Sequence, residues 1–174
     1  MKGNRMIDID VRISKAIADS VQRGALSRKL ADMFAQQLIW FMAGGFGLIT
    51  YYLSKAVVDG FVRRLLLGII LSWIATLVLE YAFRRRRPFQ EQSRKLSIEM
   101  LWVTPSFPSG HATLAFAIAT ATHALHDATL YGIALALAIL VSVGRVGVRV
   151  HYLTDVIAGA AVGIIVTSLV IRYL

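Results

Sequence analysis

The sequence predicts an all-α fold: a polytopic membrane helical bundle of five transmembrane helices, preceded by an amphipathic interfacial helix at the N-terminus. Hydrophobic residues make up 57% of the 174 residues and charged residues only 17%, whereas a soluble domain carries about 25% charged residues. The mean hydropathy is +0.64, and the uncharged residues fall into five long stretches. The absence of cysteine excludes disulfides and cysteine-ligated metals.

The first segment, residues 1–32, is charged and amphipathic. Its first residues are not followed by an apolar run, so a signal peptide is not expected. Ile13, Ile17 and Val21 recur every four residues with charged side chains between them, which predicts a helix broken near Gly24. Such a helix either lies on the membrane surface or forms a solvated arm.

The second segment, residues 33–174, is expected to be the transmembrane domain. A membrane-spanning helix needs about 20 residues, and polar residues at the ends of shorter stretches can face a protein interior. We therefore accept five spans: Met33–Ser54, Leu65–Leu79 (reaching Phe83 if Glu80 is tolerated), Ala112–His126, Ala128–Val143 and Val156–Ile171.

Glycines in the first and last spans are expected to allow neighbouring helices to approach closely. They are Gly44, Gly45 and Gly47 in the first span and Gly159 and Gly163 in the last. The last two have the small-xxx-small spacing of close helix pairs, and we expect them to pack within the monomer rather than to form a dimer face.

Five spans place the polar segments of the chain on one side of the membrane. The loop 84–108 and the link 144–155 share the side of segment 1–32, and the other side receives only short turns near 55–61 and 123–129. Candidate chemistry is therefore expected at one membrane face.

The link between the last two spans carries Arg145, His151 and Asp155. If residues 151–155 are helical, the histidine and the aspartate lie one turn apart on one face. The carboxylate would then hold one imidazole nitrogen and leave the other free to attack, while Arg145 offers a planar donor fork to an anion. The alternative is a pair that only pins the loop.

The segment Pro108-Ser109-Gly110-His111 opens the third span. Ser109 is a candidate N-cap, and Gly110 allows close backbone approach at a helix N-terminus, which favours phosphate binding. His111 in the first turn could donate a proton to a leaving oxygen. The alternative is an ordinary helix start with an incidental histidine.

Four arginines, Arg84 to Arg87, follow the second span and precede Pro88. Anchoring at lipid headgroups accounts well for Arg84 and Arg85 and less well for Arg87. These segments contain no Asp/Glu cluster for Mg²⁺. Two histidines, one acid and the arginines at one face therefore predict metal-free phosphoryl transfer through a phosphohistidine.

In these residues the chain resembles the type 2 phosphatidic acid phosphatase superfamily, which includes lipid phosphatases and vanadium haloperoxidases. Three motifs match in order over residues 60–174: Arg87-Pro88 of the first, all of Pro108-Ser109-Gly110-His111, and Arg145, His151 and Asp155 of the third. The resemblance implies that His151 is the nucleophile, Asp155 orients it, and His111 is the general acid. It implies that Arg87, Arg145, Ser109 and the Gly110 backbone bind the phosphoryl oxygens.

Two positions depart from the family pattern. Glu80 stands where the first motif has Lys, and Gly144 where the third has Ser. A bare carboxylate would repel a phosphate, so we expect an ion pair between Glu80 and Arg84, four residues on. Our hypothesis is that Arg84 or Arg86 replaces the missing Lys charge. Gly144 keeps only its backbone N–H.

The leading hypothesis is an integral membrane lipid phosphatase without a cofactor or metal. The compact chain resembles undecaprenyl-diphosphatase members most, so undecaprenyl diphosphate is the preferred substrate. The alternatives are phosphatidylglycerol phosphate, phosphatidic acid and lipid A phosphates. A hypothesis of another class is a non-catalytic lipid-headgroup binder or transport component, which would not require His151 with Asp155. Haloperoxidase relatives are soluble, which disfavours that activity.

The expected partners are a lipid phosphate and the bilayer, and the oligomeric state is left open. The net charge of +9 does not indicate nucleic acid, because the cations cluster near apolar ends. The resemblance implies the bacterial inner (cytoplasmic) membrane. The positive-inside rule would place the cation-rich side in the cytoplasm, whereas relatives that recycle carrier lipids face outward. The extracytoplasmic side is slightly preferred.

Overall fold

The computed structural model describes residues 5–56, 59–91 and 104–174, and these contain helices and no strand, which confirms the all-α prediction. Part of the loop 84–108 and of the turn near 55–61 lies outside the described residues. The helices are α1 (Arg5–Gln22), α2 (Ala25–Gln36), α3 (Leu38–Ala56), α4 (Asp59–Phe83), α5 (Pro88–Glu91), α6 (Gly110–His123), α7 (Ala128–Gly147) and α8 (Leu153–Tyr173).

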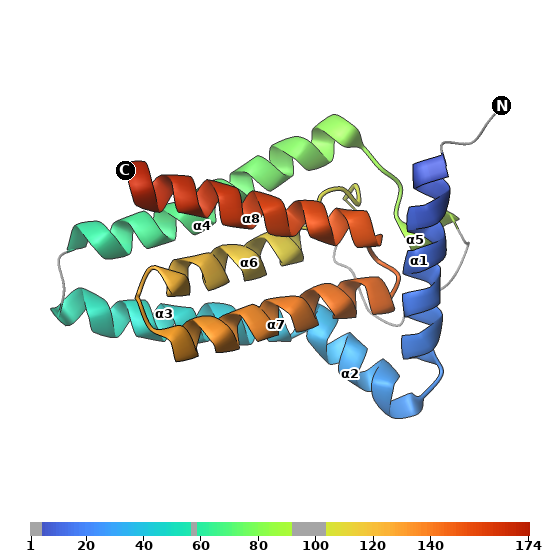
Figure 1. The fold of residues 1–174 in the computed structure, drawn as a ribbon, viewed down its shortest axis with the longest axis horizontal. Coiled ribbons are helices and arrows are strands. Elements are labelled where there is room, and N and C mark those ends of the chain that lie inside the picture. The colour runs from blue at the N-terminus through green and yellow to red at the C-terminus, as the bar shows by residue number, and fades with distance from the viewer. Residues whose placement is uncertain (1–4, 57–58, 92–103) are drawn as a thin grey trace.

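The long helices α3, α4, α6, α7 and α8 run along one common direction (Figure 1). Helix α1 crosses one end of this bundle, and α2 slants from α1 into α3. The turn between α6 and α7 and the C-terminus lie at the opposite end. The chain break expected near Gly24 is present between α1 and α2, but α2 continues to Gln36, past the expected boundary at residue 32.

Three helical stretches are long and apolar enough to cross a membrane: Val62–Gln90, Ala128–Gly147 and Leu153–Tyr173. The pair Ala25–Gln36 and Leu38–Tyr52 qualifies as a fourth if its 45° bend belongs to one span. Helix α6 has 14 residues, or about 21 Å at about 1.5 Å per residue, against an apolar bilayer core of about 30 Å. The count of five spans therefore stays a prediction.

Glycines on α8 decide how closely it packs against α6. A Cβ on Gly159 would lie 2.5 Å from the Ser109 carbonyl oxygen, and one on Gly163 would lie 2.4 Å from that of Thr113. The predicted packing within the monomer is confirmed at these two positions. The expectation for Gly44, Gly45 and Gly47 is wrong within the described residues, because a Cβ there would meet no atom within 4 Å.

Candidate active site

Three links meet at the end of the bundle that α1 crosses: residues 84–87 after α4, 104–109 before α6, and 148–152 between α7 and α8. Helix α4 ends where Arg84 takes a left-handed backbone conformation (φ 47°). The Ser106 amide then donates to the Arg85 carbonyl (2.8 Å), and the Ser109 amide donates to the Asp155 carbonyl (2.9 Å). These backbone bonds fix the second link against the first and third.

His151 is buried in the third link, before the first residue of α8. Its Nδ1 lies 2.8 Å from the Ser106 carbonyl oxygen and 3.7 Å from Oδ2 of Asp155. A carbonyl only accepts, so Nδ1 carries the hydrogen and the lone pair of the neutral ring is on Nε2. The expected helical turn over 151–155 is wrong, and the short hydrogen bond comes from the Ser106 carbonyl.

Two buried arginines flank the Nε2 atom of His151. Nη1 of Arg87 lies 3.2 Å from it, and Nη2 of Arg145 lies 3.4 Å from it. Arg87 is fixed by bonds to the Thr104 carbonyl (2.8 Å), Thr104 Oγ1 (2.9 Å) and the Val150 carbonyl (3.2 Å). Both guanidinium groups are thus positioned beside the one imidazole nitrogen that carries a lone pair.

The same surroundings keep His151 neutral. Burial lowers the pKa of His151 well below its ordinary value, and the positive charges of Arg145 and Arg87 lower it further. The hydrogen bond to the Ser106 carbonyl acts in the opposite direction and is outweighed. A neutral imidazole is the form that can act as a nucleophile.

Four buried side-chain polar atoms have no hydrogen-bond partner among the described residues, and two of them belong to predicted phosphate ligands: Ser109 Oγ and Arg145 Nε. Ser109 occupies the N-cap position of α6, as expected, but its hydroxyl does not cap the helix. Unpaired buried donors are costly, and an oxyanion held beside them would remove that cost. Next in the chain, a Cβ on Gly110 would lie 2.8 Å from the Trp73 ring, so any larger residue there would require the Trp73 side chain to shift.

His111 lies on the first turn of α6 and is partly buried. It is close enough to Arg87, Arg145 and His151 to interact with each electrostatically. The structure therefore brings together the residues that the sequence selected as nucleophile, general acid and phosphate ligands.

Asp155 has partners that the sequence did not indicate. Its Oδ2 accepts from the Tyr152 amide (2.8 Å), and its Oδ1 accepts from Nη1 of Arg85 (2.7 Å). The other end of the Arg85 guanidinium pairs with Asp10 on α1 (2.7 Å). Arg85 is thus more than a headgroup anchor, and Asp10 gave no sequence signal because it lies 145 positions from Asp155.

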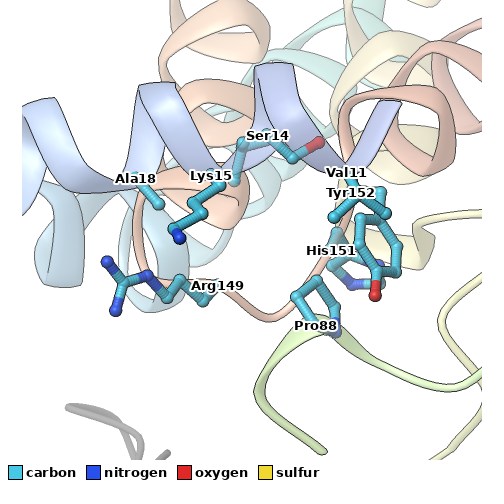
Figure 2. Close-up of a pocket in the computed structure, with 9 residues that line it drawn as sticks. Val11, Ser14, Lys15, Ala18, Pro88, Arg149, His151 and Tyr152 are labelled. Atoms are coloured by element: carbon cyan, nitrogen blue, oxygen red, sulfur yellow. The ribbon is translucent and has the colours of Figure 1, made fainter. Parts of the chain in front are cut away.

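Helix α1 covers the link that carries His151. Figure 2 shows Ser14, Lys15 and Ala18 of α1 on one side of a narrow pocket, with Arg149 and His151 on the other. Arg149 also forms an ion pair with Asp19 of α1. The N-terminal segment is therefore packed on the site and is not a free arm.

A family model described as the PAP2 superfamily matches residues 61–174. The chain belongs to the PAP2 superfamily. The match spans most of the chain and includes every motif residue that lines the site.

Several known proteins are similar to this chain. A curated relative, the bacitracin transport permease protein BcrC of Bacillus licheniformis, is 23% identical over 159 residues, 91% of this chain and 77% of that protein. The phosphatidylglycerolphosphate phosphatase of Bacillus subtilis, described as a transmembrane PAP2 type, has a TM-score of 0.75 at 23% identity, covering 99% of this chain and 87% of that one. Aquifex aeolicus LpxE has a TM-score of 0.72 at 24% identity, and the match covers 95% of this chain and 96% of that one. The candidate membrane-spanning helices of this chain support an integral membrane protein.

Glu80, where the PAP2 pattern has Lys, is buried at the end of α4. Its carboxylate interacts with the charges of Arg87 and Arg145 and with the Thr104 hydroxyl. Arg84 is exposed and its Nε donates to the Tyr81 carbonyl (3.1 Å), so the expected Glu80–Arg84 pair is not formed. Arg86 is exposed as well. A role for Arg84 or Arg86 toward phosphate stays a prediction.

Gly144, where the PAP2 pattern has Ser, lies against α2. A Cβ there would be 2.7 Å from the Ala35 amide nitrogen and 2.9 Å from the Phe34 Cβ. The close approach lets the Ala35 carbonyl accept from Nη1 of Arg145 at 3.0 Å. Glycine at this position therefore exchanges a hydroxyl for a backbone partner that holds Arg145.

The described residues contain no group of three or more His, Cys, Asp or Glu side chains arranged to hold a metal ion. The independence of the reaction from metal remains an expectation that a chelator can test.

Proposed function

We propose that this protein is a membrane lipid phosphatase that works through a phosphohistidine on His151. One observation carries the proposal: the Ser106 carbonyl fixes the hydrogen on Nδ1, and the free Nε2 lies between Arg87 and Arg145. The same two cations that surround the nucleophile would bind the oxygens of the phosphoryl group that it attacks.

The reaction has two displacements at phosphorus. Nε2 of His151 bonds to phosphorus as the bond to the leaving oxygen breaks, and His111 protonates that oxygen. Water then attacks phosphorus, the P–N bond breaks, and His111 takes the water proton. Asp155 Oδ2, 3.7 Å from Nδ1, would stabilise the positive charge that the ring gains on phosphorylation. Arg87, Arg145, Ser109 and the Gly110 amide would hold the equatorial oxygens.

An apolar pocket of about 190 Å³ supports a lipid substrate. It lies between α7 and α8, and apolar side chains including Ile17, Val143, Val146 and Ile157 line it. Val146, the residue after Arg145, is among its lining residues. We infer that the hydrocarbon chain of the substrate occupies this pocket.

For the headgroup we propose an isoprenyl diphosphate, with undecaprenyl diphosphate as the preferred member. The compact chain with short loops supports this choice by resemblance. Phosphatidylglycerol phosphate, phosphatidic acid and lipid A phosphates are the alternatives. We further propose the bacterial inner membrane as the location, with the site on the extracytoplasmic side.

A second candidate is a lipid-headgroup binder or transport component without turnover, and the relative that is called a transport permease favours it. A protein that only binds a lipid headgroup needs the arginines. It does not need a neutral histidine whose unprotonated nitrogen faces them.

Phosphate release by the purified protein in detergent with EDTA tests the proposal on these four lipid classes. We expect release from the wild type and from His123→Ala, an exposed histidine at the far end of the bundle, and none from His151→Ala. Turnover that survives in His151→Ala would contradict the phosphohistidine. Binding without release by folded wild type would favour the second candidate.

A further inference from the structure

Arg85 holds Asp155 from the side away from His151. Its Nη1 donates to Asp155 Oδ1 at 2.7 Å, whereas the other carboxylate oxygen, Oδ2, faces His151. The guanidinium carbon lies 4.0 Å from the centroid of the Tyr152 ring, and Nη2 donates to Asp10 Oδ2 at 2.7 Å. A planar fork held at both ends and stacked on a ring has one orientation. It therefore fixes the rotation of the Asp155 carboxylate.

Asp10 and Ser14 of α1 cap the N-terminus of α8, the helix that carries Asp155. Asp10 accepts from the Thr154 amide (3.1 Å) and hydroxyl (2.6 Å), and Ser14 Oγ accepts from the Leu153 amide (2.8 Å). These first-turn amides have no partner within their own helix. A different helix thus supplies partners for two of these amides, and these bonds connect α1 directly to the first turn of α8.

Asp10 is charged in this position. Burial by itself would raise the pKa of Asp10, but hydrogen bonds from Thr154 and Arg85 outweigh it and hold that pKa below its ordinary value. The carboxylate therefore keeps Arg85 paired at both ends.

We propose that Asp10 and Arg85 are positioning residues that act through Asp155, so that helix α1 is part of the catalytic apparatus. The proposal rests on the phosphohistidine function above. Without Arg85, Oδ1 of Asp155 loses its bond to Nη1. The carboxylate keeps the Tyr152 amide bond at Oδ2 but is oriented less firmly toward Nδ1, where it stabilises a phosphorylated, positively charged ring. Such a loss slows the chemical step and leaves the arginines that bind phosphate in place.

The test uses Arg85→Lys and Asp10→Asn in the full chain. Lysine keeps the charge but lacks the planar fork whose two nitrogens, Nη1 and Nη2, donate separately to Asp155 and Asp10. Asparagine keeps the shape of Asp10 without its charge. We expect kcat to fall on the order of tenfold in each, as for other groups that orient a catalytic residue, with KM within about twofold. Asp19→Asn is the matched control, because it removes the ion pair of α1 with Arg149 and should leave kcat unchanged.

A double-mutant cycle separates positioning from folding. Arg85→Lys should cost nothing further in an Asp155→Asn background, because both changes remove the same function. The proposal would be overturned if the double variant lost as much kcat as the product of the two single losses. It would also be overturned if kcat stayed within twofold of wild type in both Arg85→Lys and Asp10→Asn. If a variant does not fold, Thr154→Val replaces it, because this change removes only the hydroxyl that lies between Arg85 and Asp10. We expect the same fall in kcat, and a kcat within twofold of wild type would again overturn the proposal. The proposed function has a separate test: it fails if the wild type and His151→Ala release phosphate at the same rate, whatever the Arg85 and Asp10 variants do.

Discussion

The Nδ1–H of His151 donates to the carbonyl oxygen of Ser106 across 2.8 Å, and this single bond fixes which imidazole nitrogen is unprotonated. The free nitrogen, Nε2, faces Arg87 and Arg145. The position of Ser106 is in turn set by its bonds to the carbonyls of Arg85 and Arg86. The arginine-rich link therefore contributes its backbone as well as its side chains to the site.

The first prediction concerns the charge of His151. Because burial and then Arg145 and Arg87 lower its pKa, the ring should stay neutral when the pH falls below about 6.5, the ordinary histidine value. ¹⁵N NMR of histidine-labelled protein in micelles measures this, with the signal assigned by its loss in His151→Gln. Since the folded state binds this proton more weakly than the unfolded state, acidification below about 6.5 should also lower the free energy of unfolding. Titration of His151 at or above 6.5 would contradict the electrostatics described here.

The second prediction separates the role of His111 from that of the nucleophile. A monoester leaves as an alkoxide and needs a proton, whereas a diphosphate leaves as phosphate, a better leaving group. His111→Ala should therefore lower kcat for a lipid monophosphate on the order of 10²-fold or more and spare much of the activity on an isoprenyl diphosphate. Equal losses on the two substrates would show that His111 is not the acid for the leaving oxygen. Circular dichroism of the variant controls for folding.

Side chains with a chemical signature could be selected from the sequence, and contacts made by the backbone could not. His111, Arg87, Arg145 and His151 meet as predicted, because each belongs to a local motif beside an apolar stretch. The carbonyls of Ser106 and Ala35 carry no signature, since any residue has one. Asp10 acts across 145 positions, and only the folded arrangement of α1 against α8 brings it to Asp155.

The helices, too, were predictable where the sequence carries a signature and not where packing decides. Hydrophobic stretches predicted where α4, α7 and α8 lie, because lipid-facing and core-facing positions are both apolar. The bend between α2 and α3 and the 14-residue length of α6 depend on packing against neighbours. The glycines of α8 and α3 have similar local patterns, but only those of α8 face another backbone.

The third prediction tests why Gly144 replaces serine. A side chain there would meet the backbone of α2 at 2.7 Å, so Gly144→Ser should lower the free energy of unfolding by about 1–3 kcal/mol through overpacking. It should also lower activity, because the Ala35 carbonyl that holds Arg145 moves with α2. Gly132→Ser on the same helix is the control, since no atom lies within 4 Å of its Cβ position. Thermal unfolding in detergent gives the comparison. Equal stability of the two variants would refute the packing argument.

The fourth prediction concerns the apolar pocket between α7 and α8. Ala160 lines it, so Ala160→Phe should fill it and raise KM for a long-chain lipid phosphate. A short-chain phosphate that does not reach the pocket should be hydrolysed as by the wild type. Ile164→Phe, at an exposed position on the same helix, is the control for added bulk. If both chain lengths respond alike to Ala160→Phe, the hydrocarbon chain binds elsewhere.

The fifth prediction concerns which side of the membrane holds the site. Ser20 on α1 and Thr129 in the first turn of α7 are exposed. Helix α1 crosses one end of the bundle, and α7 begins at the other end (Figure 1). The native chain has no cysteine, so Ser20→Cys and Thr129→Cys each introduce a single thiol without background. If the site faces outward, an impermeant thiol reagent applied to intact cells should label Ser20→Cys and spare Thr129→Cys until the membrane is opened. The reverse pattern would place the site in the cytoplasm, as the cations near α1 would favour, and the enzyme would then act on lipid phosphates of the inner leaflet.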